Sequence, residues 1–423
     1  MISETEYKTR RERFAKKLKS NSVAALFSAE PKTRSHDTEY PYRQDNNFYY
    51  LSGFKEDKAV LVFVKEKRKV KSYLFVYKKD ATEELWNGKR LGVATAKKRF
   101  LVDDVFEYGE LSRKLKEFLE AKSRLYYDFA LDYSKVKLLK RYASSVNNFK
   151  NAAKYLYKMR LLKSDAEIAL IKKALNITEE AHHKAMNKVN LVTYEYELQA
   201  EIEYVFRKNG ATGDAYTSIV ASGNNANTLH YIDNNAKIKK ERLILIDAGS
   251  EYEYYASDIT RTISSSKKFT QAQKELYQLV LDVEKEIIAM IKPAVLRTTL
   301  QKKSEELLCA GMVKLGILKG DVKQLLKKNL HKKYYPHGIG HWMGLDVHDT
   351  CPYKTKKGKE IPLKAGMVMT IEPGIYIEEN DDNVPKRFRG IGIRIEDDIL
   401  VTKNGYENLS YKIDKEIKDI QNH

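Results

Sequence analysis

The chain has 423 residues, 42% of them hydrophobic, and a formal net charge of +19. This length predicts two or three domains, and the apolar content suffices for a sizeable core, which excludes disorder for most of the chain. No stretch approaches the ~18 consecutive apolar residues of a membrane-spanning helix. The acidic start has no apolar segment, so we expect neither a membrane protein nor a secretory signal.

The cysteines and the positive charge point away from several other classes of protein. Cys309 and Cys351 are the two cysteines; they form no disulfide framework and match no zinc spacing. Reduced thiols indicate a cytoplasmic protein. The lysines are scattered and interspersed with Asp and Glu, which is typical of a solvated surface and predicts neither a nucleic-acid nor a membrane partner.

The amino-terminal part of the sequence alternates predicted helices and strands. Ser3 and Glu6 form a capping box that begins the first helix, and a further helix is expected over 111–119. Strand-like runs cover 23–27, 48–51, 59–64, 72–77 and 125–130. This alternation indicates an α/β domain, which we assign to residues 1–162.

Long predicted helices dominate the remainder, residues 163–423. Capping boxes begin helices at Ser164 and Thr270, and apolar periodicity predicts two more over 193–209 and about 299–315. Between them lie β-type segments at 243–246, 254–262, 367–371 and 392–400. Helices grouped around antiparallel strands make this second domain, and the chain as a whole, α+β.

Carboxylates occupy positions where predicted strands should be apolar. Asp247 ends the first of these strands, and a hairpin would return Asp258 to its side. Two bare carboxylates in contact repel each other, which raises a pKa, and a divalent cation would remove that repulsion. Glu372 ends another apolar strand, while Arg394 and Glu396 share one face of a strand because residues two apart point the same way. Four such carboxylates are costly to bury unpaired.

Histidines gather in the same part of the sequence. Three of the nine, His337, His341 and His348, fall within one glycine-containing segment, and His230 precedes the first acidic strand. His182 and His183 lie on a predicted helix, and we interpret both as structural.

The chemistry of these donors predicts a metal site. Four carboxylates would balance the charge of two divalent ions with a bridging hydroxide between them, and one imidazole adds a nitrogen ligand. Oxygen-dominated sites suit Mn²⁺ and similar hard ions. Paired metal ions generate a hydroxide nucleophile and stabilise a developing oxyanion, so the expected reaction is a metal-assisted hydrolysis.

These segments resemble a known family, the Xaa-Pro aminopeptidases of the creatinase/methionine-aminopeptidase ("pita-bread") superfamily. The matching segments lie at 222–231, 243–249, 257–262, 337–348, 370–374 and 389–397. The segments at 40–44 and 48–54 resemble the creatinase-like amino-terminal domain of that family. The resemblance implies a creatinase-like α/β domain followed by a pita-bread catalytic domain.

The resemblance also implies the metal ligands. Asp247 would hold one metal ion, Asp258 and Glu396 would bridge both, and His341 and Glu372 would hold the second. Glu372 would also exchange a proton with the bridging hydroxide.

Further roles follow from the same resemblance. His230 and His348 would line the substrate site and steady the oxyanion, and His337 would transfer a proton or position the substrate. Arg394 would orient His348 or the prolyl end of the substrate, and Tyr376 would hold the carboxylate network or the substrate.

The implied activity is release of the first residue from peptides with proline in second position, by attack of a metal-bridging hydroxide. An Xaa-Pro bond has no amide N–H, so a peptidase cannot recognise it through that group. Trp86, in a segment that resembles a loop, would wall the substrate site of its own or a partner subunit, whereas its alternative role is packing in a core or dimer contact. The family implies a homodimer or homotetramer.

Three alternatives remain at this stage. A prolidase, which cleaves Xaa-Pro dipeptides, shares the fold and the metal ligands. A methionine aminopeptidase is disfavoured by the additional amino-terminal domain. A non-catalytic protein that uses the positive charge to hold RNA or ribosomes would have lost metal ligands and gained a basic insert, and the sequence shows neither.

Overall fold

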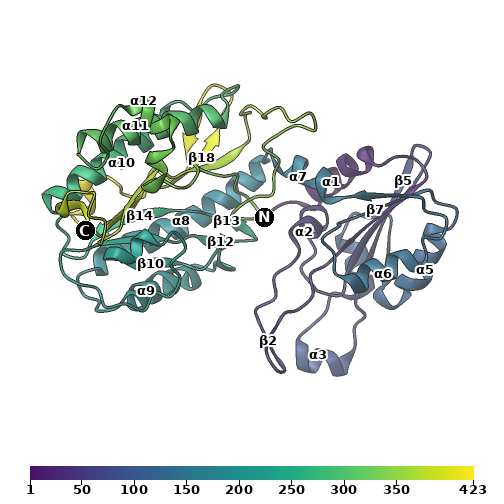
Figure 1. Ribbon diagram of the computed structural model, residues 1–423. Helices are drawn as coiled ribbons and strands as arrows, with labels where there is room; N and C mark the ends of the chain where they lie inside the picture. Colours follow the sequence, from purple (N-terminus) through teal and green to yellow (C-terminus); the bar gives the residue numbers. More distant parts are fainter. The chain divides into compact units, whose positions relative to one another are not determined.

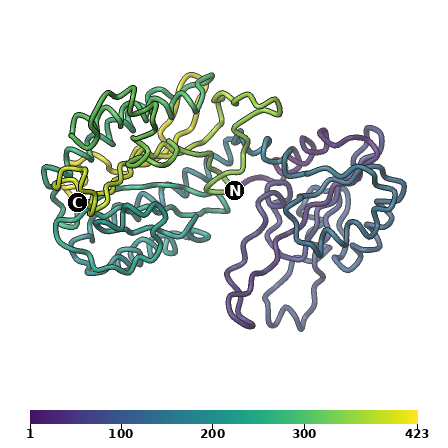
Figure 2. Tube along the Cα trace, viewed as in Figure 1, coloured from purple at the N-terminus to yellow at the C-terminus, as the bar shows by residue number.

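The computed structural model describes all 423 residues, and they form two compact units. The amino-terminal unit is Met1–Met159 and the carboxy-terminal unit is Arg160–His423 (Figure 1). Both units mix helices and strands, as the α+β prediction requires. Figure 2 follows the chain from the amino-terminal unit into the carboxy-terminal unit. None of the helices combines the length and apolar character needed to cross a membrane.

The amino-terminal unit is built on one six-stranded sheet in the order β6-β5-β4-β1-β7-β8. Its strands are β1 (Ser22–Phe27), β4 (Val60–Glu66), β5 (Lys69–Val76), β6 (Asp104–Glu107), β7 (Arg124–Tyr127) and β8 (Asn148–Asn151), and a separate hairpin pairs β2 (Thr33–Ser35) with β3 (Thr38–Glu39). The helices are α1 (Glu4–Lys17), α2 (Asn46–Ser52), α3 (Ala81–Asn87), α4 (Gly92–Arg99), α5 (Leu111–Leu119), α6 (Tyr133–Arg141) and α7 (Ala153–Arg160), with a 3₁₀ turn, η1 (Tyr108–Glu110).

The central strand of this sheet, β1, is apolar because it is buried. Every residue of β1 is buried, and β1 pairs antiparallel with β4 and parallel with β7. Helix α5 places Leu111, Leu115 and Leu119 on one face, because residues four apart lie above one another, and all three are buried in the core of the unit. The predicted helix over 111–119 is confirmed.

Two local predictions in this unit are wrong. The run at 48–51, predicted as a strand, lies in helix α2, where the Asp45 carboxylate accepts a hydrogen bond from the Phe48 N–H at 2.7 Å and Gly53 ends the helix with φ +67°. A short apolar run does not distinguish a strand from a buried helix, and these caps decide it. Trp86 lies in helix α3 rather than in a loop, since the Asp80 side chain caps that helix.

The carboxy-terminal unit contains longer helices and several small sheets. Its helices are α8 (Asp165–Lys188), α9 (Glu195–Lys208), α10 (Gln271–Ala289), α11 (Arg297–Lys314), α12 (Val322–Lys327) and α13 (Ile417–Ile420), with 3₁₀ turns η2 (Gly223–Asn227), η3 (Leu330–Lys333) and η4 (Lys386–Phe388). The predicted capping boxes at Ser164 and Thr270 begin α8 and α10.

The strands of this unit pair antiparallel, within four sheets. The sheets are β10-β11-β14, β13-β12-β9, β15-β18-β19 and β16-β17. Their strands are β9 (Gly213–Asp214), β10 (Ile219–Ser222), β11 (Leu243–Asp247), β12 (Ser250–Tyr252), β13 (Tyr255–Ala256), β14 (Thr260–Ser264), β15 (Val368–Ile371), β16 (Gly374–Ile377), β17 (Ile391–Arg394), β18 (Asp397–Val401) and β19 (Tyr406–Asn408).

Two predicted strands are interrupted, each at a carboxylate. The segment 254–262 divides into β13 and β14, with Asp258 between them, and the segment 392–400 divides into β17 and β18, with Glu396 between them. The Asp258 N–H donates to the Asp398 carboxylate at 3.1 Å, and the Glu396 N–H donates to the Thr260 carbonyl at 3.1 Å. The backbone N–H groups of Asp258 and Glu396 thus bond to residues of other strands, outside the regular strand pairing. Both carboxylates therefore lie where a strand is interrupted.

Candidate metal centre

Three carboxylates meet where β11, β14 and β18 begin or end. Asp247 is the last residue of β11 and pairs in register with Thr260, so Asp258 is returned to its side as the hairpin prediction requires. One carboxylate oxygen from each of Asp247, Asp258 and Glu396 lies within 4.8 Å of the others. A second group at the same spacing joins His341 and Glu372 to Glu396. The five predicted ligands therefore surround one place.

A close backbone approach brings His341 to this place. A Cβ atom on Gly340 would lie 1.9 Å from the carbonyl oxygen of Thr370, so only glycine allows the segment to pack against β15. The His341 N–H then donates to the Thr370 hydroxyl at 3.1 Å. Since Glu372 directly follows β15, its carboxylate lies 3.7 Å from the Nε2 atom of His341.

The hydrogen bonding of His341 prepares its other nitrogen for a ligand. Its Nδ1 atom is 3.1 Å from the Trp342 carbonyl, a group that can only accept, so Nδ1 carries the proton. Nε2 faces Asp258 at 3.3 Å. Burial opposes protonation of this ring, but the Asp258 carboxylate raises the pKa of His341 to about 9. A metal ion would take the place of that second proton.

The electrostatics of the carboxylates favour a bound cation. Burial and the neighbouring negative charges raise the pKa of Asp247, and they raise the pKa of Glu396 well above its usual range. Burial raises the pKa of Glu372 to about 7. Buried carboxylates repel one another unless protons or cations neutralise them, and oxygen donors with one imidazole suit a hard divalent ion. The residues present therefore fit a divalent metal centre.

Arg394 connects the carboxylates to the wall of the pocket. It is fully buried, and its guanidinium donates to the Asp247 carboxylate at 2.5 Å, to the Tyr376 hydroxyl at 3.0 Å and to the Thr260 hydroxyl at 3.0 Å. His348 is not among these partners. Tyr376 in turn lies 2.8 Å from Nε2 of His337, whose Nδ1 lies 2.9 Å from the Gly338 carbonyl. Burial and the Arg394 charge lower the pKa of His337 to about 4, so this imidazole is neutral and accepts from Tyr376.

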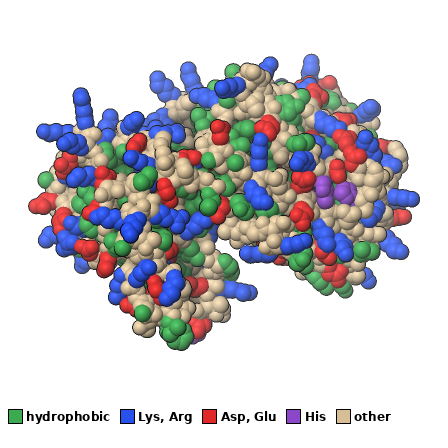
Figure 3. Space-filling view, turned by 180° about the vertical axis from the view of Figure 1, so that it is seen from behind, with side chains coloured by type: hydrophobic (Ala, Val, Ile, Leu, Met, Phe, Trp, Pro, Cys, Tyr) green, Lys and Arg blue, Asp and Glu red, His purple; other side chains and the backbone are tan.

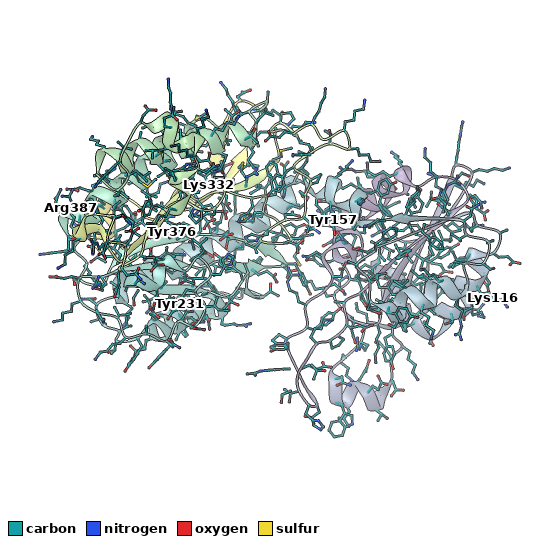
Figure 4. The ribbon with its side chains drawn as sticks, in the orientation of Figure 1. Lys116, Tyr157, Tyr231, Lys332, Tyr376 and Arg387 are labelled. Atoms are coloured by element: carbon teal, nitrogen blue, oxygen red, sulfur yellow. The ribbon has the colours of Figure 1, made fainter.

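The remaining predicted residues are divided between the two units. His230 and His348 line the same pocket of about 250 Å³ as the five ligands, and the His348 ring meets the His341 ring edge-on at 4.2 Å. Tyr376 and Tyr231, both labelled in Figure 4, pack in a small apolar cluster of the same unit. Trp86 belongs to the amino-terminal unit and is 80% exposed there.

Two residues of the site escaped sequence reasoning. The Thr260 hydroxyl donates to the Glu396 carboxylate at 2.7 Å while it accepts from Arg394. The Tyr216 hydroxyl donates to the Asp247 carboxylate at 2.6 Å. Thr260 lies inside a motif segment, which is a weak signal for such a role. Tyr216 comes from the segment before β10, and no pattern marks it.

Comparison with known proteins agrees with this geometry. Residues 169–403 match metallopeptidase family M24, and residues 7–126 match the aminopeptidase P amino-terminal domain. The chain belongs to metallopeptidase family M24. It is 39% identical to the Xaa-Pro aminopeptidase of Escherichia coli K12, with 99% of this chain and 97% of that protein covered. It is 39% identical to the Xaa-Pro aminopeptidase of Haemophilus influenzae, with 100% and 97% covered. A solved structure of E. coli aminopeptidase P with the inhibitor Pro-Leu superposes with a TM-score of 0.96 at 38% identity, with 100% of this chain and 98% of that chain covered.

Membership in the M24 family confirms the predicted resemblance and fold. The chain is a metal-dependent exopeptidase, a hydrolase that uses divalent ions, and dinuclear metal use is in keeping with its family. The relatives favour an aminopeptidase acting on Xaa-Pro peptides over the alternative, a prolidase.

Proposed function

We propose that the M24 site of this chain removes the first residue from peptides with proline in second position through two Mn²⁺ ions. The observation that carries this proposal is the convergence of four carboxylates and one correctly oriented imidazole on a single pocket. Asp247 would hold one ion, Asp258 and Glu396 would bridge both, and His341 and Glu372 would hold the other.

When bound, such a pair of ions supplies a hydroxide nucleophile and stabilises the oxyanion that develops on the attacked carbonyl. Mn²⁺ is proposed because the donor set is oxygen-dominated and contains no thiolate. The carboxylates need charge neutralisation that the single guanidinium of Arg394 does not supply.

The proton in the reaction is assigned to Glu372. Its carboxylate lines the pocket beside the other ligands, and a carboxylate in such a position can act first as a general base and then as a general acid. Glu372 would take the proton of the attacking water and deliver it to the prolyl nitrogen that leaves. His337, whose Nδ1 lies 3.7 Å from the Glu372 carboxylate, would position the substrate and assist that transfer.

Other side chains would bind and orient the substrate. His230 and His348 line the pocket beside the metal ligands, which suits donation to the substrate carbonyl as it becomes an oxyanion. Arg394 would hold Asp247 and Tyr376 in place, and Tyr376 would keep His337 oriented. Trp86 would wall the substrate site of its own or a neighbouring subunit.

We also propose the domain boundaries, the oligomeric state and the cellular location of the enzyme. We assign residues 1–162 to the creatinase-like domain and 163–423 to the catalytic domain, and we expect a homodimer or homotetramer. Cys309 and Cys351 are both free and buried, which suits the cytoplasm. The face in Figure 3 intersperses Lys and Arg with Asp and Glu. We expect neither a nucleic-acid nor a membrane partner.

The test compares two substrates and one variant. The chelator-treated protein is assayed with Arg-Pro-Pro and with Arg-Pro, before and after addition of Mn²⁺. Release of arginine from the tripeptide only with metal, and its loss in Glu372→Gln, supports the proposal. Cleavage of the dipeptide alone means a prolidase, and cleavage of neither substrate contradicts the proposed activity.

A further inference from the structure

A second group of metal-binding side chains lies in the carboxy-terminal unit and shares no residue with the catalytic pocket. It consists of His183 in α8, Asp414 in the segment before α13, and His423 after α13. One donor atom from each lies within 4.8 Å of the others. The mechanism proposed above uses none of these residues.

The two imidazoles converge on the same carboxylate oxygen. Nε2 of His183 lies 3.4 Å from Oδ2 of Asp414, and Nε2 of His423 lies 2.8 Å from the same atom. The two rings lie 4.9 Å apart and are tilted by 30°. All three side chains are partly buried, with 17 to 35% of each exposed. The cluster is thus open to an ion from solvent but held within the fold.

We propose that His183, Asp414 and His423 form a binding site for a transition-metal ion of the zinc type, distinct from the catalytic centre. Two imidazoles and one carboxylate are the donors of three-ligand zinc sites, in which water completes a tetrahedron. The site therefore differs in chemistry from the oxygen-rich catalytic centre and should prefer Zn²⁺ to Mn²⁺.

One of the two ligand separations at Asp414 already suits a tetrahedral ion, and the other is shorter. With metal–ligand bonds of about 2.0–2.1 Å, neighbouring ligands of a tetrahedral zinc lie about 3.3 Å apart. The separation of His183 from the Asp414 oxygen, 3.4 Å, already matches that edge. The contact from His423, at 2.8 Å, has the length of a hydrogen bond and would have to lengthen by about half an ångström on loading.

The protonation of the two rings also bears on metal binding. Nε2 of His183 accepts a hydrogen bond from the Asp414 backbone N–H at 3.4 Å, so this nitrogen presents a lone pair, which a metal ion would have to take from that N–H. Nδ1 of His423 faces the Asn187 amide nitrogen at 3.1 Å, which leaves the proton on Nε2, toward Asp414. Metal binding therefore requires this proton to move from Nε2 to Nδ1 of His423. The hydrogen bond from the Asn187 amide to Nδ1 must break at the same time. An acceptor at position 187 should favour the loaded state, as carboxylate partners of metal-bound histidines do.

Three charged side chains lie around this cluster, and neither cation among them occupies the Asp414 carboxylate. Lys267 donates to the backbone carbonyl of His423 at 2.7 Å, and Arg261 donates to the backbone carbonyl of Asp414 at 3.0 Å. Both cations bind carbonyls and leave the Asp414 carboxylate free for the imidazoles. Glu179 is a further negative charge that acts on His183.

A loaded site would stabilise the segment that supports the catalytic strands. Arg261, besides its bond to Asp414, donates to the carbonyl of Glu396 at 2.6 Å. An ion bound by Asp414 and by His183 of α8 would therefore help to fix the Asp414 backbone, which Arg261 contacts. Arg261 in turn contacts the backbone of Glu396. The effect of the ion should be seen in stability and not in the chemistry of the catalytic pocket.

The experiment counts bound zinc in the full chain, purified without a polyhistidine tag and stripped with chelator. Three equivalents are expected for the wild type and two for His423→Ala, with at least a ~100-fold loss of affinity at the third site, because removal of a ligand exceeds the effect of an outer-shell change. Asn187→Asp should bind the third ion about tenfold more tightly. The matched control is His36→Gln, which replaces an exposed histidine of the amino-terminal unit. This variant should retain three zinc equivalents.

A second background separates this site from the catalytic one. In Asp258→Ala/Glu396→Ala, one zinc equivalent should remain, its cobalt form should show the intense visible absorption of a tetrahedral site, and Asp414→Asn should abolish it. If this background does not fold, the wild-type count decides. Two equivalents in the wild type, or a third that survives both His423→Ala and Asp414→Asn, would overturn the proposal and leave the cluster as an ion pair.

Discussion

Replacement of Thr260 by valine removes one hydroxyl with nearly no change of shape. Thr260 is completely buried, and its hydroxyl accepts from Nε of Arg394 at 3.0 Å while it donates to the Glu396 carboxylate at 2.7 Å. Thr260→Val therefore leaves one buried donor and one buried acceptor without partners. Glu396, the proposed bridging ligand, loses the bond that orients it.

The size of the effect follows from these two contacts. A hydrogen bond to a charged group contributes about 1.5–3 kcal/mol, and an unsatisfied buried group costs a similar amount. If the ligand carboxylate bears one such loss, the metal affinity falls by about 10- to 100-fold, since ~1.4 kcal/mol corresponds to a factor of ten. This range agrees with the effect of outer-shell changes at metal sites.

The assay is a competition between the protein and a chelator of known affinity for Mn²⁺, with Thr260→Ser as the control. The serine keeps the hydroxyl and should stay within about threefold of the wild type in metal affinity. Equal metal binding by Thr260→Val and wild type would refute the reasoning that Thr260 orients Glu396.

Three further changes test other parts of the structure. Gly340→Ala should destabilise the protein by about 3 kcal/mol or more, because its Cβ would lie 1.9 Å from the Thr370 carbonyl; a wild-type urea midpoint would contradict this. Tyr376→Phe should lower kcat about 10- to 100-fold with little change in metal content, because His337 and Arg394 lose their shared partner; an unchanged kcat would refute that role. Against the effect of burial, Lys333 and Tyr334 lower the pKa of Asp381 to about 2. Asp381→Asn should therefore cost about 1–2 kcal/mol at pH 7, and the difference from wild type should shrink as the pH falls below the ordinary Asp value toward 2; a gap that stays constant in urea melts at both pH values would contradict this.

The sequence singled out the carboxylates that converge in the structure, because they stand out against their surroundings. Asp247 and Glu372 follow runs of apolar residues, and a carboxylate at such a position requires a partner. Sequence reasoning also placed the long helices α8 and α10 through their capping boxes, which combine a side-chain signal with long apolar periodicity.

The misses concern short segments and contacts between distant ones. The aromatic run that forms α2 is too short to show a period, so the caps at Asp45 and Gly53 decided its structure. The bonds of Thr260 to Glu396 and of Tyr216 to Asp247 join segments far apart in the chain. No local pattern records such contacts, because they depend on how the sheets meet.

The central claim is that the five converging ligands hold the ions that perform the hydrolysis. The most direct test titrates Mn²⁺ into chelator-stripped protein while arginine release from Arg-Pro-Pro is followed, in the wild type and in Glu396→Ala. The account predicts that wild-type activity saturates as two ions bind per catalytic pocket, and that the variant binds fewer ions and releases no arginine. Full activity in the stripped wild type, or in Glu396→Ala, would contradict it.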